Sequence, residues 1–374
     1  MDVAVLTDGR VLVVNAGSSS LKLRLLGSDD DVTASVELAA AHGRFDRTEV
    51  EDALADVNEV DAVGHRIVHG GTSFTEAAMI TDEVKGRLRS LASLAPLHQP
   101  PALEALDLVT EVLPEVPQVA CFDTAFHSSI PPAAATYAIP EQWRRDFSIR
   151  RYGFHGLSHA YGARRAAQML DRSPGDLRIV TCHLGAGASL AAVQGGVSID
   201  TTMGFTPLEG LVMATRSGTI DPGIVTWLQR QAGLGVDEIA EALERRSGLT
   251  ALAGTPDMKE VLRRAEAGDD AARLAVDVYV HRFCASVAAM VSSLGGLDVL
   301  VFTGRIGERA AAIRERSAAK LDWLGVEIDA EINGAAQDDA VISAPGASVA
   351  TLVVESREDL EIARQVRAAL ARSS

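Results

Sequence analysis

The sequence predicts a two-domain α/β protein. Its 374 residues exceed the length at which one hydrophobic core usually stops growing. Strand-like and helix-like segments alternate along the chain, with Pro and Gly at the joints. A unit of strand, small-residue turn and strand occurs at 11–26 and again at 178–194, which indicates that one α/β unit is duplicated. We therefore expect two such domains around a cleft.

The individual elements follow from residue patterns. Each repeat predicts a β-hairpin, with strands at 11–14 and 21–26 in the first and at 178–184 and 190–194 in the second. Strands are also expected at 62–68 and 116–122, and helices at 82–94, 100–112 and 158–171. From Glu358 to Arg372, apolar residues recur at helical spacing, which predicts an amphipathic C-terminal helix that packs back on a domain.

Composition argues against several function classes. The net charge of −16 and the scattered Lys and Arg residues argue against a nucleic-acid partner. A small anion can still bind where a few cationic side chains and backbone N–H groups converge. The three cysteines are far apart and predict reduced core residues. No basic segment with a long apolar stretch opens the chain, and polar residues interrupt the apolar segment 284–302, so we expect a cytoplasmic protein without a membrane span.

The first polar motif is a serine-rich turn between two strands. VVNAGSSSLK (13–22) places Asn15, Ser18, Ser20 and Lys22 around a sharp turn, where they can face a phosphate or its metal. The motif is not a P-loop, because GxxxxGK[ST] is absent. Taken alone, the motif is better explained as an ordinary serine-rich hairpin.

Two charged residues lie in or after apolar strands. Arg66 lies inside the apolar strand of GHRIVHGG (64–71). Removing its charged side chain from water costs roughly several kcal/mol unless an anion pairs with it. That anion is either a ligand or an internal carboxylate. Asp123 in CFDTAFHSSIP (121–131) ends a strand, where open α/β sheets carry their functional loops. It is a candidate ligand, with a helix or turn cap as the alternative.

The remaining motifs are rich in glycine. His155 lies between two glycines that allow close backbone approach, with a core histidine as the alternative. HLGAGAS (183–189) is a Gly-rich turn that suits nucleotide phosphates. Arg216 lies among Thr, Ser and Gly in the loop 203–223, and FTGRIGER (302–309) opens a helix after a strand. No single motif decides a function.

Together the motifs resemble the acetate kinase family, a group of actin-like phosphotransferases with duplicated RNase-H-like domains. The resemblance runs in the family's order through nearly the whole chain: VVNAGSSSLK, HRIVHGG, APLHQP, FDTAFH, RRYGFHGLSH, HLGAGAS, TPLEGLVMATRSG and TGRIGE. It implies a first domain of residues 1–124 plus 358–374, and a second of 125–357 that binds nucleotide and forms a homodimer.

The resemblance also implies roles for the acceptor side. Asp123 and His155 match catalytic residues, and Arg66 and Arg216 match the arginines that hold the carboxylate and the phosphoryl group in flight. A carboxylate substrate is already ionised near neutral pH, so Asp123 should orient groups and hold metal rather than act as a base. The implied metal contacts are Asn15 and Glu358, and the implied apolar pocket for the substrate is formed by Val68, Leu97, Phe154 and Pro207 beside Arg66.

For the donor side the resemblance implies ATP or ADP with Mg²⁺, or with Mn²⁺ in its place. The matching positions are Ser18, Ser20, Lys22, His183, Leu184, Gly185, Ala186, Gly187, Asp257, Met258, Lys259, Gly304, Arg305, Ile306, Gly307 and Glu308. Several depart from the family pattern, because Ala186 and Arg309 replace Asn, Arg305 replaces Gly, and Lys259 replaces an adenine-side Arg. These departures leave the donor open.

The expected reaction is reversible, Mg²⁺-dependent, direct in-line phosphoryl transfer from ATP to acetate. Its transition state needs positioning and cationic stabilisation. One methylene changes discrimination in an apolar pocket by only about 1–3 kcal/mol, so propionate or another short-chain carboxylate is an alternative acceptor. A pyrophosphate-using variant and a catalytically silent, actin-like nucleotide-binding protein are two further hypotheses.

Overall fold

The computed structural model describes residues 9–17, 20–40, 45–55, 59–95 and 99–373. The chain divides into two compact units, which we describe separately. The first comprises residues 1–128, 154–157 and 357–374, and the second comprises 129–153 and 158–356. Residues 125–128, 154–157 and 357, which the sequence placed in the second domain, group with the first unit.

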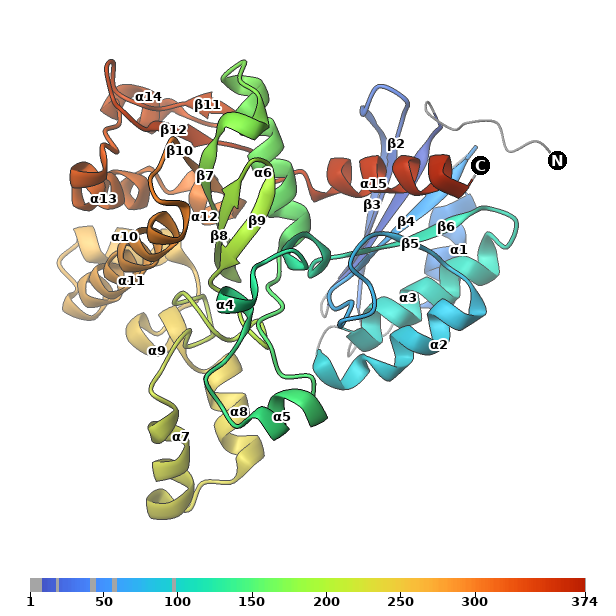
Figure 1. Ribbon diagram of the computed structural model, residues 1–374, viewed down its shortest axis with the longest axis horizontal. Helices are drawn as coiled ribbons and strands as arrows, with labels where there is room; N and C mark the ends of the chain where they lie inside the picture. Colours follow the sequence, from blue (N-terminus) through green and yellow to red (C-terminus); the bar gives the residue numbers. More distant parts are fainter. Residues whose placement is uncertain (1–8, 18–19, 41–44, 56–58, 96–98, 374) are drawn as a thin grey trace. The chain divides into compact units, whose positions relative to one another are not determined.

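A six-stranded mixed sheet forms the centre of the first unit (Figure 1). Its strand order is β3-β2-β1-β4-β6-β5, and β1, β4 and β6 are parallel neighbours. The hairpin and both predicted strands are confirmed, and the helix predicted at 82–94 ends earlier, at Ser90, before a short 3₁₀ turn. The elements are β1 (Val11–Ala16), β2 (Ser20–Leu26), β3 (Val32–Ala39), α1 (Arg47–Ala55), β4 (Ala62–Ile67), β5 (Ala78–Met79), α2 (Asp82–Ser90), α3 (Gln99–Val112), β6 (Gln118–Phe122) and α15 (Glu358–Ser373).

The second unit also contains a six-stranded sheet, in the order β11-β12-β10-β7-β8-β9. Its strands are β7 (Arg178–Leu184), β8 (Ala188–Gln194), β9 (Val197–Thr201), β10 (Val299–Thr303), β11 (Ala340–Val341) and β12 (Ala350–Val353). Its helices are α4 (Pro132–Ala135), α5 (Glu141–Asp146), α6 (Gly156–Met169), α7 (Pro222–Trp227), α8 (Val236–Arg245), α9 (Gly248–Ala253), α10 (Met258–Glu266), α11 (Asp270–Leu294), α12 (Gly304–Arg309), α13 (Ala311–Leu321) and α14 (Ala330–Ala335).

The two sheets repeat one topology, as the sequence predicted. Three antiparallel strands (β1–β3 and β7–β9) are followed by two strands parallel to the first (β4 and β6, β10 and β12) and a short antiparallel edge strand (β5, β11). Each edge strand precedes its partner in the chain. The equivalence extends to connectivity, which supports duplication of one α/β unit.

Both faces of the first sheet are covered. Leu12 and Val14 of β1 belong to a core with residues of α1 and α3. Val11 and Val13 belong to a different core with residues of α15. Because side chains alternate along a strand, the two cores lie on opposite faces of the sheet. The predicted C-terminal helix is confirmed and packs on this unit.

Helix α11 forms much of the core of the second unit. It is long and apolar enough to cross a membrane by length and composition, but half of its most apolar window is buried. Val276, Phe283 and Val287 are buried on its inner side, and it contacts β7, β8 and β9. A buried core helix can be as long and apolar as a membrane span, and the packing of α11 on the sheet accounts for its hydropathy.

The packing of α15 requires a glycine on β4. A Cβ atom at Gly64 would lie 2.5 Å from Cγ2 of Ile362 and 2.7 Å from Cγ2 of Val366. We expect Gly64→Ala to lower the free energy of unfolding by about 1–3 kcal/mol, because the overpacked core must shift. Gly86→Ala in α2 is the control, since a Cβ there meets nothing within 4 Å and should stabilise the helix by up to about 1 kcal/mol. Urea denaturation measures both, and equal effects would contradict this packing argument.

Three histidines of the first unit are buried as neutral groups. His65, His69 and His127 are at most 1% exposed, and burial lowers the pKa of each to about 4. His65 Nε2 lies 2.7 Å from Gln118 Oε1. Protonation of any of the three would place a charge in a region that excludes water.

Mild acid should therefore destabilise the protein. The folded pKa of about 4 lies below the ordinary 6.5, so the unfolded chain takes up protons first as the pH falls below 6.5. The free energy of unfolding should fall by roughly 1 kcal/mol per histidine between about pH 7.5 and pH 5.5. In urea denaturation His65→Gln should reduce this loss, and His281→Gln, at an exposed position of α11, is the matched control. The same loss in His65→Gln as in the parent would show that His65 does not contribute.

Candidate active site

Arg66 is the centre of a polar cluster in the first unit. Its Nε and Nη2 donate to the two carboxylate oxygens of Asp123, at 3.1 and 2.8 Å. Its Nη1 donates to Asn15 Oδ1 at 3.3 Å and lies 3.4 Å from Glu358 Oε2. Asn15, Arg66 and Asp123 lie at the carboxyl ends of the parallel neighbours β1, β4 and β6, and Glu358 begins α15. Four predicted residues are thus brought together.

The cluster is largely shielded from water. Asp123 is 1% exposed, and the side chains of Arg66 and Glu358 are 21% and 15% exposed. Burial alone would lower the pKa of Arg66, but the carboxylates of Asp123 and Glu358 raise it above its usual range. The internal ion pair that the sequence allowed for Arg66 is present, and Asp123 is its partner.

The oxygens around Arg66 are of the kind that Mg²⁺ prefers. Mg²⁺ usually takes one or two carboxylates, water and substrate phosphates as ligands. Within the described part of the chain, no three His, Cys, Asp or Glu side chains form a metal site. Asn15, Glu358 and Asp123 offer oxygens of this kind, and substrate phosphates and water would have to supply the remaining ligands of a magnesium ion.

His155 lies in a strained loop next to Asp123. Its φ of 55° is in the left-handed region, which costs a non-glycine residue conformational energy and is often found at functional sites. Gly156 N donates to the carbonyl oxygen of Asp123 at 2.9 Å, and a Cβ at Gly156 would lie 2.2 Å from that oxygen. The glycine therefore allows the backbone next to His155 to approach Asp123.

Phe154, a predicted pocket residue, is 1% exposed and held by two histidines. His127 Nε2 donates to the carbonyl oxygen of Phe154 at 3.0 Å, and the His69 ring meets the Phe154 ring edge-on at 5.5 Å. Gln99 in turn bonds the backbone N–H and carbonyl of His69, at 3.3 and 3.2 Å. These three supporting residues were not predicted, and their only signal was their place in or beside the motifs HRIVHGG, APLHQP and FDTAFH.

Of the described residues predicted in the serine-rich turn, Asn15 joins the Arg66 cluster, whereas Ser20 and Lys22 bond elsewhere. Lys22 faces Asn15 across the β1–β2 register, but its Nζ lies 3.5 Å from Glu37 Oε1. Ser20 Oγ donates to the same Glu37 oxygen at 2.9 Å. Of the other residues predicted in this unit, Val68 is half-buried after β4, and Ser18 and Leu97 lie outside the described residues.

In the second unit, Arg216 lies in the loop between β9 and α7. Its Nη1 donates to the carbonyl oxygen of Pro207 at 3.3 Å, so these two predicted residues are neighbours. Burial lowers the pKa of Arg216. Arg151 supports the start of the loop, because it donates to the carbonyl oxygens of residues 201–203 and to Glu209 Oε1 at 2.7 Å. Arg151 was not predicted, although it lies in the motif RRYGFHGLSH.

A cavity of about 890 Å³ lies beside the Gly-rich turn between β7 and β8. This volume suits a small-molecule ligand. Predicted nucleotide-binding residues line it from three segments: Gly185, Ala186, Asp257, Met258, Lys259, Arg305 and Ile306. The other nucleotide-binding residues predicted in the second unit do not line this cavity: His183, Leu184, Gly187, Gly304, Gly307 and Glu308.

Cationic side chains line this cavity although the chain is acidic. Lys259, Arg263, Arg305 and Arg309 line it together with Asp257 and Glu266, and Arg263 is also paired with Glu260 at 2.7 Å. Asp257 also caps α10, because its Oδ1 accepts from Lys259 N at 3.1 Å. The lining therefore favours an anionic ligand.

Arg314, a residue that the sequence did not single out, holds the end of α12. It is 1% exposed and donates to the carbonyl oxygens of Gly307 and Glu308, both at 2.8 Å, and to Asn333 Oδ1 at 2.7 Å. Burial lowers its pKa to about 10. Glu308 Oε1 accepts from Ser356 N at 2.8 Å, and burial raises the pKa of this carboxyl. These contacts of Gly307 and Glu308 hold α12, the helix that lines the cavity.

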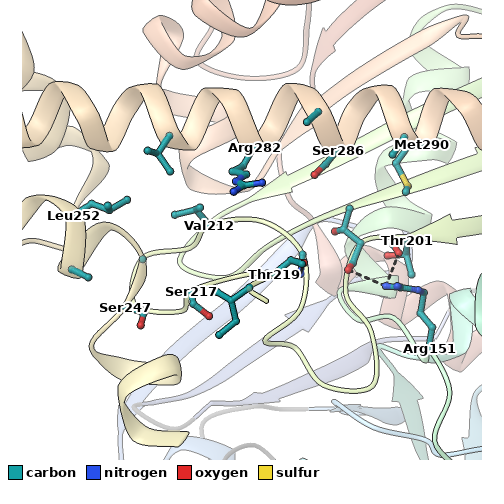
Figure 2. A pocket seen from close by; sticks show the side chains of 18 of the residues that line it. Arg151, Thr201, Val212, Ser217, Thr219, Ser247, Leu252, Arg282, Ser286 and Met290 are labelled. Carbon is teal, nitrogen blue, oxygen red and sulfur yellow. Dashed lines mark hydrogen bonds between the residues drawn. The ribbon is translucent and has the colours of Figure 1, made fainter. Parts of the chain in front are cut away.

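A second cavity, of about 590 Å³, lies between α11 and the loop that carries Arg216. Figure 2 shows Arg282 and Ser286 of α11, with Ser217 and Thr219 from the loop among the other lining residues. None of the predicted site residues lines it. It adjoins the Arg216 loop without adding a candidate catalytic group.

Comparison with known proteins points to one family. The sequence profile of the Acetokinase family matches residues 36–364. The chain is 49% identical over 314 residues to the acetate kinase of Gloeobacter violaceus, which covers 83% of this chain and 77% of the relative. It is 43% identical over 366 residues to the acetate kinase of Rippkaea orientalis, which covers 98% and 89%.

Solved structures agree. The acetate kinase of Porphyromonas gingivalis superimposes with a TM-score of 0.90 at 35% identity, covering 97% of this chain and all of the other. A propionate kinase from Francisella tularensis gives a TM-score of 0.89 at 35% identity, covering 96% and 99%. These matches confirm the predicted fold class, two duplicated RNase-H-like domains of the actin-like type. The chain belongs to the acetokinase family.

Proposed function

We propose that the protein is an acetate kinase that transfers a phosphoryl group reversibly between ATP and acetate, with Mg²⁺, by direct in-line transfer. The observation that carries the proposal is the Arg66 cluster, because a partly buried guanidinium with a carboxylate, an amide and a second carboxylate around it suits an anionic acceptor and a cation together. Membership of the acetokinase family and relatives named acetate kinases support it.

The residues of both units serve one reaction in this proposal. Acetate is ionised at neutral pH, so no base is required, and Asp123 orients groups and holds metal instead. Arg66 and Arg216 hold the carboxylate and the phosphoryl group, whose charge spreads over its equatorial oxygens in the transition state. His155 supplies a further donor to those oxygens. Mg²⁺, with Asn15 and Glu358 among its ligands, would neutralise developing charge on the phosphates.

The donor and acceptor each have an alternative with an observation behind it. The cations around the larger cavity suit ATP, and they would equally suit inorganic pyrophosphate. The similarity to a propionate kinase keeps propionate as an alternative acceptor. A silent nucleotide-binding protein is disfavoured, because such a protein has no use for the assembled acceptor-side cluster.

The proposal includes a cytoplasmic homodimer formed through residues 125–357. Apolar side chains on the surface of the second unit, Ile224 and Trp227 of α7 at 45% and 60% exposure among them, are of the kind that interfaces bury. Light scattering of the purified protein measures the assembly, and a monomer's mass at every concentration would exclude it.

The direct test is formation of acyl phosphate, trapped as hydroxamate. We expect Mg²⁺-dependent product from acetate and ATP, with less from propionate and from pyrophosphate as donor. If only pyrophosphate gave product, pyrophosphate would take the place of ATP as the proposed donor. If only propionate gave product, propionate would take the place of acetate as the proposed acceptor. Absence of product from every pair would remove the catalytic proposal and leave the fold standing.

Loss of the phosphoryl-holding arginine should abolish most turnover. We expect Arg216→Ala to lower kcat by on the order of 10³ or more, as for other arginines that stabilise phosphoryl transfer. Arg245→Ala, at the exposed end of α8, is the control and should keep normal kcat. Near-normal turnover in Arg216→Ala would exclude Arg216 from the mechanism.

A further inference from the structure

Asp123 occupies the edge of Arg66 that a substrate carboxylate would use. The two hydrogen bonds from Nε and Nη2 to the Asp123 oxygens form the bidentate arrangement that arginine makes with any carboxylate. Acetate is a carboxylate of the same shape. An acceptor that binds this edge of Arg66 must therefore compete with Asp123.

The same cluster contains the oxygens that a divalent cation would need. Asn15 Oδ1 and Glu358 Oε2 lie 3.3 and 3.4 Å from Arg66 Nη1, and Asp123 directs both its oxygens to the guanidinium. An oxygen that coordinates a hard cation becomes a poorer acceptor for Arg66, and the cation repels the guanidinium at this range. Cation binding should therefore weaken the bonds that hold Arg66.

We propose that Arg66 stands in for the metal at these oxygens, and that a divalent cation and the carboxylate acceptor bind with positive cooperativity even without nucleotide. When the cation takes the oxygens of Asn15, Asp123 and Glu358, the donors of Arg66 turn to the acceptor. The coupling is reciprocal, so the acceptor strengthens cation binding by the same factor. This inference rests on the proposed function, because it assigns acetate to Arg66.

The neighbouring charges provide a control. Asp359, which follows Glu358, accepts from Arg24 at 3.0 Å and from Arg357 at 3.0 Å. Like Arg66, Arg24 is an arginine of the first unit that pairs with an aspartate. When Arg24 is removed, Asp359 still keeps its ion pair with Arg357. Arg24→Ala perturbs a comparable pair without touching the oxygens around Arg66.

The experiment measures binding of Mn²⁺ to the full-length protein without nucleotide, from the electron paramagnetic resonance signal of the free ion. Titrations are run with sodium acetate and with sodium chloride at equal ionic strength, and corrected for acetate–Mn²⁺ pairing in protein-free samples. We expect acetate to tighten Mn²⁺ binding by about 5-fold or more in the wild type and in Arg24→Ala. In Arg66→Gln we expect no effect of acetate and a Kd for Mn²⁺ no weaker than that of the wild type.

Each result decides the inference. Equal Mn²⁺ affinity with and without acetate in the wild type overturns it, and this arm needs no variant to fold. A Kd for Mn²⁺ that weakens about 10-fold in Arg66→Gln also overturns it, because Arg66 would then hold the oxygens for the metal instead of competing for them. Wild-type protein that forms acetyl phosphate but shows no coupling loses only this inference, whereas protein that forms no acyl phosphate loses the proposed function.

Discussion

An arginine that is taken out of water at the end of a β-strand needs anionic or polar partners around it. Arg66 finds these partners at the carboxyl ends of the neighbouring strands β1 and β6. A guanidinium without partners in such a place would lower the stability of the fold by roughly several kcal/mol. The parallel order β1-β4-β6 puts Asn15 and Asp123 on either side of Arg66, since the carboxyl ends of parallel strands meet at one edge of a sheet. The packing of α15, which depends on Gly64, adds Glu358. The sheet order and one helix thus determine the composition of the site.

Duplication explains why the two units share a scaffold but differ in chemistry. The second sheet repeats the strand order of the first, yet β4 carries Arg66 near its carboxyl end whereas β10 ends in Thr303. The Gly-rich turn of β7 and β8 borders a cavity with cationic walls instead. One unit therefore concentrates its polar groups around a single guanidinium, and the other leaves a volume that a larger anionic ligand can fill.

Much of the fold could be predicted from the sequence, because its signals are local. Apolar strand-like runs, the two small-residue turns and the helical spacing of Ile362, Val366 and Leu370 depend only on neighbouring residues. Arg66 and Asp123 could be singled out because charged residues in or after apolar strands require partners. Their pairing with each other could not be predicted, because it depends on strand order, which is a property of the folded sheet.

The supporting residues were missed for a related physical reason. His69, Gln99 and His127 act on Phe154 through backbone bonds and ring contacts, and these leave no pattern in sequence spacing. Arg314 resembles any surface arginine on a helix until its burial is known. The departures at Lys259, Arg305 and Arg309 were visible in the sequence, but only the cavity shows that all three side chains line one volume.

The account depends most on the claim that Arg66 and Asp123 act as one unit, and a double-mutant cycle tests that claim directly. The free energy of unfolding of Arg66→Gln, Asp123→Asn and the double variant would be measured by urea denaturation. We predict that the double variant is destabilised less than the sum of the single variants by about 2 kcal/mol or more, because each single change takes the two-bond ion pair away from a buried partner. Additive effects would contradict the account, since the two side chains would then contribute to the site independently.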